Sequence, residues 1–151
     1  MNDYEINGST LAIVPLGENI SEVYEAENRY IVNKSPNAII KDNCEFYGSS
    51  YEGRCRGTKN LTGIKSKFPI IIEESRNIIF FPTSSVRSNE NTWIALNNIK
   101  NYSEKNLNSK IVFKNNEKLE LGISYYSLDN QICRAYMLNS KLYDRKKERK
   151  K

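Results

Sequence analysis

The chain has 151 residues, of which 38% are apolar, and this is enough for one domain with a single hydrophobic core. Its 23 basic and 18 acidic residues give a net charge of +5, and it has no histidine, which excludes a Ser-His-Asp triad, a Cys-His pair and every metal site with a histidine ligand. The mean hydropathy of −0.66 and the lack of any apolar run of about 18 residues exclude a transmembrane helix.

The first part of the chain predicts a hairpin, short strands and a helix. Apolar residues alternate around Asn7-Gly8, a pair typical of a type I′ turn, so residues 3–15 predict a β-hairpin. Residues 23–32 predict one or two short strands. Ser35-Pro36 is typical of a helix start, and apolar side chains at helical spacing continue from there to Tyr47.

A second helix is expected directly after the first. Ser49 and Glu52 have the spacing of a capping box, which predicts a helix over about residues 50–61. With Gly48 between them, the two helices loosely resemble a helix-turn-helix, whose second helix would enter the major groove. This signal is weak, because two helices joined by a glycine-containing turn are common.

The second half of the chain predicts short strands followed by a long helix. Pro82 ends one strand because proline cannot donate a hydrogen bond to a sheet, and a polar loop over residues 83–91 follows. From about Ser127 the apolar positions fall on one helical face, and we expect this helix to continue into the basic C-terminus. The predicted strands cover residues 69–72, 78–81, 93–96, 111–113 and 119–121.

These elements predict an α+β fold, a single domain with a mostly antiparallel sheet of short strands and hairpins and about three helices. The side chains that we expect in its core are Phe46, Tyr47, Phe80, Trp93, Ile123 and Leu128.

Charge is unevenly distributed along the chain. Residues 145–151 contain six basic residues and one acidic residue, so their net charge of +5 equals that of the whole chain. Residues 1–144 are neutral overall, acidic before residue 41 and basic between residues 41 and 67. We therefore expect a domain over residues 1–144 with a basic tail over residues 145–151, a distribution that permits phosphate binding without requiring it.

The cysteines and the N-terminus indicate a cytoplasmic protein with reduced thiols. Cys44, Cys55 and Cys133 are odd in number and widely spaced, which fits neither a disulfide framework nor a zinc site. The N-terminus lacks the basic and apolar regions of a signal peptide. Buried thiols are the simplest interpretation, although Cys55, between Arg54 and Arg56, is also a candidate for redox sensitivity.

Two enzymatic motifs are suggested by the residues but fit poorly. The segment from Gly57 to Lys65 resembles a P-loop, yet it has five residues between its glycines and Ile64 before the lysine, so we expect no nucleotide site. Glutamates that could serve a metal-dependent nuclease are Glu73, Glu74, Glu117 and Glu120. Adjacent glutamates on a strand point in opposite directions, so a solvated turn explains them better, and we expect no cofactor and no metal.

A basic region in the middle of the chain is the strongest candidate for binding. Long cations neutralise phosphates, and Arg, Lys and Asn side chains also enter A/T-rich minor grooves. A solvated helix surface explains the same composition equally well, and Arg54 and Arg56 fall on different helical faces, so the whole set cannot touch one groove. The candidate DNA-binding residues are Arg54, Arg56, Lys59, Asn60, Lys65, Lys67, Arg87, Arg134 and Lys141.

Several segments resemble the ComK family of competence transcription factors. The most distinctive is Cys44-Glu-Phe-Tyr-Gly-Ser-Ser-Tyr-Glu-Gly-Arg54, continuing to Gly57-Thr58. The others keep the family's order over about residues 4 to 140, and they are Tyr4–Gly8, Lys67–Ile70, Phe81–Ser85, Trp93-Ile94 and Ile123–Ser127 with Asn130-Gln131.

The resemblance implies a cytoplasmic, nucleoid-associated activator of DNA-uptake genes in a Gram-positive bacterium. Such proteins bind paired A/T-rich boxes in double-stranded DNA, largely through the minor groove, as dimers that form tetramers, and they are degraded through an adaptor of a regulatory protease. Some members continue past the end of this chain, and the adaptor-binding motif lies in that extra segment, so we do not expect the motif here.

Two other functions stay open from the residues alone. One is a short paralogue that acts as a protein-interaction module without sequence-specific DNA binding, because residues 1–144 carry no net charge. The other, less favoured, is the metal-dependent nuclease.

Overall fold

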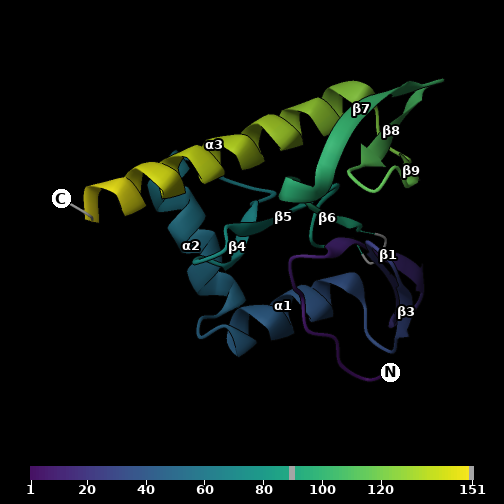
Figure 1. Ribbon diagram of the computed structural model, residues 1–151, viewed down its shortest axis with the longest axis horizontal. Helices are drawn as coiled ribbons and strands as arrows, with labels where there is room; N and C mark the ends of the chain where they lie inside the picture. Colours follow the sequence, from purple (N-terminus) through teal and green to yellow (C-terminus); the bar gives the residue numbers. More distant parts are fainter. Residues whose placement is uncertain (89–90, 150–151) are drawn as a thin grey trace.

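The computed structural model describes residues 1–88 and 91–149, which form three α-helices, a short 3-10 helix and nine strands in two antiparallel sheets (Figure 1). The larger sheet has six strands in the order β3-β2-β1-β6-β5-β4, and the smaller has three in the order β7-β8-β9. The structure therefore confirms the predicted α+β class, with three helices and mostly short antiparallel strands.

The first hairpin lies further along the chain than predicted. It joins β1 (Thr10–Gly17) to β2 (Ile20–Glu25), and β3 (Arg29–Val32) follows. The predicted hairpin over residues 3–15 is wrong because both backbone groups of Ile6 are bonded to helix α1 rather than to a strand. Its N–H donates to Asn43 Oδ1 at 2.8 Å, and its carbonyl accepts from the Tyr47 hydroxyl at 2.7 Å.

Helices α1 (Pro36–Phe46) and α2 (Tyr51–Thr62) lie where the sequence predicts them. Ser35 caps α1 by accepting a hydrogen bond from the Ala38 N–H. The cap of α2 is Ser50 rather than the predicted Ser49, since Ser50 Oγ accepts from the Gly53 N–H at 2.9 Å.

The six-stranded sheet, here called the central sheet, separates two layers of apolar side chains. Side chains along β4 (Ile70–Glu73), β5 (Ile78–Pro82) and β6 (Trp93–Ala95) alternate between them, because successive strand residues point to opposite faces. One layer packs against α1 and the start of α2, and the other against α3 and the smaller sheet. Helix α2 also covers the edge strand β4, where the buried Thr58 hydroxyl donates to the Pro69 carbonyl at 2.7 Å.

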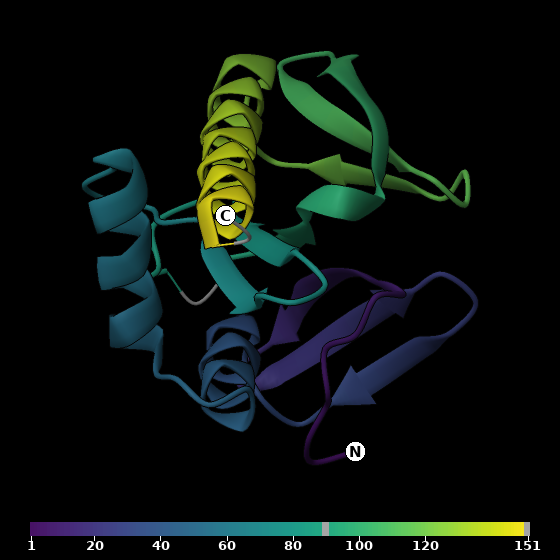
Figure 2. The same cartoon turned by 60° about the vertical axis from the view of Figure 1, so that its left-hand side comes forward.

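The C-terminal half supplies the second sheet and the longest helix. After a 3-10 turn (Leu96–Asn98), the chain forms β7 (Ile99–Lys105), β8 (Asn108–Phe113), β9 (Lys118–Leu121) and α3 (Tyr125–Arg149). The sequence did not predict strand β7, because its side chains are mostly polar on both faces of the strand. Seen nearly along its axis, α3 lies between α2 and the smaller sheet (Figure 2). No helix in the described part of the chain has the length and apolar character needed to cross a membrane.

The predicted core is confirmed for its central members and wrong for one residue. Phe80, Trp93 and Leu128 are fully buried, and Tyr47 and Ile123 pack against the core while remaining partly exposed. Phe46 is 62% exposed, because α1 buries the opposite face of its last turns.

Candidate nucleic-acid interface

Helix α2 divides its polar residues between two faces, as its helical spacing predicts. Its inner face carries Tyr51 and Cys55, which pack on the core, and the buried Thr58. Arg56, Lys59 and Asn60 are exposed on the outer face. The structure therefore presents these three candidate residues together to solvent.

The loop after α2 extends this basic surface and is held in place by α3. Lys65 and Lys67 are both exposed on it. Arg134 donates to the Ser66 carbonyl at 2.6 Å and to Gln131 Oε1 at 2.6 Å, and Gln131 donates to the Lys67 carbonyl at 3.2 Å. Partial burial lowers the pKa of Arg134. Arg134 thus positions the loop that carries Lys65 and Lys67, which we call the lysine loop, and the sequence analysis did not predict this role.

One side of α3 carries a row of cations. Lys141 lies seven residues after Arg134, which is nearly two full turns, and Arg145 and Arg149 follow at intervals of four residues. The row spans about 22 Å at 1.5 Å per residue. The loop after α2 lies on this side, because Arg134 bonds the Ser66 carbonyl, and α2 itself contacts α3.

The basic residues predicted as a tail continue α3 as far as Arg149, and residues 150 and 151 lie outside the described range. Arg145 and Arg149 both bond Glu74 Oε1, at 3.1 and 3.2 Å, and Lys146 donates to Asn77 Oδ1 at 2.6 Å. The end of the helix is therefore fastened to the turn between β4 and β5.

The two remaining candidates lie apart from this surface. Arg54 is half-buried and faces the end of α3, together with Lys146 and Arg149. Arg87 is exposed on the loop after β5, which Asn37 holds beside α1 by donating to the Val86 carbonyl.

The glutamates considered for metal binding are engaged in ion pairs. Glu73 and Glu74 pair with arginines, Glu117 with Arg29, and Glu120 with Lys105. Within residues 1–88 and 91–149, no three Cys, Asp or Glu side chains gather where they could hold one ion.

Cys55 does not have the environment of a reactive thiol. Burial is the largest influence on it and raises its pKa, which outweighs a hydrogen bond involving Tyr51. The predicted redox sensitivity is therefore not supported, because a raised pKa leaves less of the nucleophilic thiolate.

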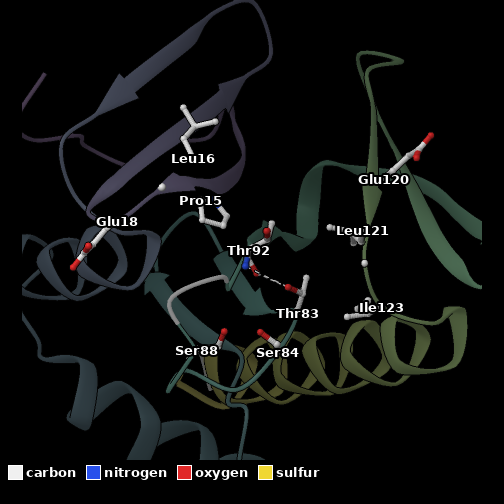
Figure 3. A pocket seen from close by; sticks show the side chains of 12 residues that line it. Pro15, Leu16, Glu18, Thr83, Ser84, Ser88, Thr92, Glu120, Leu121 and Ile123 are labelled. Atoms are coloured by element: carbon white, nitrogen blue, oxygen red, sulfur yellow. Dashed lines mark hydrogen bonds between the residues drawn. The ribbon is translucent and has the colours of Figure 1, made fainter.

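A hollow of about 930 Å³ lies between the β1–β2 turn and strand β9 (Figure 3). Hydroxyl side chains from the loop after β5 line its floor, and Glu18 and Glu120 lie on its two sides. Among the described residues that line it there is no lysine or arginine, so this hollow suits a polyanion poorly. The sequence did not predict it, because hairpins remote in the chain form its walls.

Glu73 gives the fold a specific pH dependence. Although partial burial alone would raise its pKa, hydrogen bonds from Ser75 and Arg76 lower it from 4.5 to about 2. A carboxylate with a lowered folded-state pKa stabilises the fold above its unfolded pKa, and this contribution is lost as the pH falls from about 4.5 towards 2. We expect Glu73→Gln to lose less stability than the wild type between pH 6 and pH 3, measured by urea unfolding.

The exposed Glu45→Gln on α1 is the control for this measurement and should lose stability as the wild type does. Equal losses in the wild type and Glu73→Gln would contradict the assigned role of Glu73.

The comparisons with known proteins agree with the sequence resemblance. The family model "ComK protein" matches residues 1–147. The "Competence transcription factor" of Bacillus subtilis (strain 168) is 36% identical over 149 residues, which cover 96% of this chain and 78% of that protein. No solved structure matches the chain. Because the similarity extends over nearly all of the chain, including the basic helix and loop described above, this protein belongs to the ComK family.

Proposed function

We propose that this protein is a transcription activator of competence genes, that it binds A/T-rich double-stranded DNA, and that it is not an enzyme. The observation that carries the proposal is a group of exposed cations on α2, its following loop and α3. None of them pairs with a carboxylate within the described residues, so they are free to neutralise phosphates. The group consists of Arg56, Lys59, Lys65, Lys67 and Lys141.

Selection of A/T-rich boxes is assigned to the outer face of α2. The minor groove of A/T-rich DNA is narrow and strongly negative, and it attracts inserted Arg and Lys side chains. Asn60 stands beside Arg56 and Lys59 on the same exposed face, and an amide can bond the acceptors in that groove. Phosphate contacts from the loop and α3 would orient the protein on the duplex without reading its sequence.

Self-association is a further part of the proposal, and an exposed stripe on α3 supports it. Tyr126 and Cys133 lie seven residues apart, as do Tyr136 and Tyr143, a spacing typical of helix pairing. These side chains are all exposed, and Tyr126 is 81% exposed. A second copy of the chain would cover the stripe in a dimer, and dimers would pair into tetramers. Cytoplasmic location is a proposal that rests on the family.

One binding experiment tests the function. The protein is titrated at about 150 mM salt with a duplex that carries paired A/T-rich boxes, and with a G/C-rich duplex of equal length. We expect a preference of roughly 10³-fold for the first duplex, as specific binders show. Equal and steeply salt-dependent binding to both duplexes would overturn sequence selection. It would favour the second candidate function, a protein-interaction module. Its partner would enter the hollow of Figure 3, which has Glu18 and Glu120 on its two sides.

A further inference from the structure

A second hollow, of about 490 Å³, lies where α2, the turn between β4 and β5, and the end of α3 meet. Segments far apart in the sequence converge there, because the ion pairs of Glu74 hold the end of α3 against that turn. The hollow is lined by Tyr47, Arg54, Glu73, Glu74, Ser75, Lys146 and Arg149.

Positive charge exceeds negative charge around this hollow. Glu73 is engaged by Arg76, and the single carboxylate of Glu74 is shared by Arg145 and Arg149. Lys146 donates only to neutral oxygens, the Glu74 backbone carbonyl and Asn77 Oδ1. The described lining residues therefore include three cations against two carboxylates, and Arg76 and Arg145 pair with those two carboxylates from outside the lining.

Two guanidinium nitrogens in the cluster are buried without a partner. Nε of Arg54 and Nε of Arg145 are closed off from solvent and find no hydrogen-bond acceptor within the described residues. A buried donor without an acceptor destabilises the fold, so the two nitrogens are consistent with an acceptor that binds in the functional state. The surplus of positive charge around the hollow favours an anionic acceptor.

We propose that this hollow binds a phosphate group. Guanidinium groups match the geometry of phosphate oxygens and a lysine adds a point charge, and Arg54, Arg149 and Lys146 supply both in this hollow. The inference rests on the proposed function for the source of the phosphate, which is the DNA backbone. From Arg134 to Arg149 the cation row of α3 covers about 22 Å, and the hollow lies at its end.

The site itself is tested with inorganic phosphate. Thermal unfolding is followed in phosphate and in chloride of equal ionic strength, for the wild type and for Arg54→Gln, Lys146→Gln and the control Lys114→Gln. We expect phosphate at about ten times its Kd to raise the Tm of the wild type by roughly 4 °C. Lys114→Gln should keep this rise, because Lys114 is exposed on the turn between β8 and β9 and does not line the hollow, and both variants of the hollow should lose it.

Each variant is compared with its own chloride baseline, so a change in basal stability does not affect the result, and Lys146→Gln serves if Arg54→Gln does not fold. The absence of a rise in the wild type, or an equal rise in all four proteins, would overturn the phosphate site.

A DNA titration of the same proteins identifies the source of the phosphate. If it is the DNA backbone, Arg54→Gln weakens binding to A/T-rich and G/C-rich duplexes alike and reduces the salt slope by about 0.9. Unchanged DNA affinity with a lost phosphate rise would support the site but assign it to a free phosphate compound. The phosphate measurement does not depend on sequence preference, so it stands or fails separately from the proposed activator function.

Discussion

We expect the triple variant Arg56→Gln/Lys59→Gln/Lys65→Gln to bind A/T-rich DNA about a hundredfold more weakly than the wild type at about 150 mM salt. Each phosphate contact contributes about 0.9 to the slope of log affinity against log salt, so three lost contacts reduce the slope by about 2.7. In this linear relation the electrostatic contribution to log affinity vanishes at 1 M salt. A slope change of about 2.7 between 1 M and about 150 mM salt therefore lowers the affinity about a hundredfold. A titration at three or more salt concentrations measures both quantities.

The control for this prediction removes the same charge from another part of the molecule. Lys110, Lys114 and Lys118 belong to the hairpin formed by β8 and β9, which lies across α3 from α2 (Figure 2). We expect their triple replacement with glutamine to leave most of the affinity and the salt slope intact. Equal losses in the two triple variants would mean that net charge alone drives binding, and would contradict the assigned surface.

Phe80→Ala should destabilise the fold by about 3–5 kcal/mol, a large part of the 5–15 kcal/mol typical of a whole domain. Phe80 is fully buried between the central sheet and the layer that contains α1, so its removal leaves a cavity as well as lost apolar contact. The free energy of unfolding is measured by urea denaturation monitored through Trp93, which is also buried.

Phe46→Ala makes the same chemical change at an exposed position. Because 62% of Phe46 is accessible to solvent, we expect its replacement to cost less than about 1 kcal/mol. A cost as large as that of Phe80→Ala would show that a second copy or another partner covers Phe46 in solution.

Helix α3 connects the fold to the candidate binding surface. Its apolar side completes one layer of the core. On its other sides, Gln131 and Arg134 form hydrogen bonds to the lysine loop. Near its end, Arg145 and Arg149 form ion pairs with Glu74. Cations held on a helix lose less conformational freedom on binding than cations on a disordered arm. Binding by this surface should therefore gain affinity from preorganisation.

Elements with local signals can be predicted from the order of the residues alone. The cap at Ser35 sets the start of α1, and the apolar runs predict the short strands β4, β5 and β6. Helical spacing is also sufficient to place Arg54 and Arg56 on different faces of α2. These predictions succeed because a cap, a strand and a helix face each depend on residues only a few positions apart.

Features that depend on distant partners arise only when the chain is folded. Asn43 binds the backbone of Ile6 from 37 positions away and so removes the expected first hairpin. Arg134 supports a loop 68 residues earlier, and Glu74 fastens cations 71 and 75 residues later. Such pairs form because the packing of α3 and α1 on the sheet brings them together, and no local pattern of residue types specifies that packing.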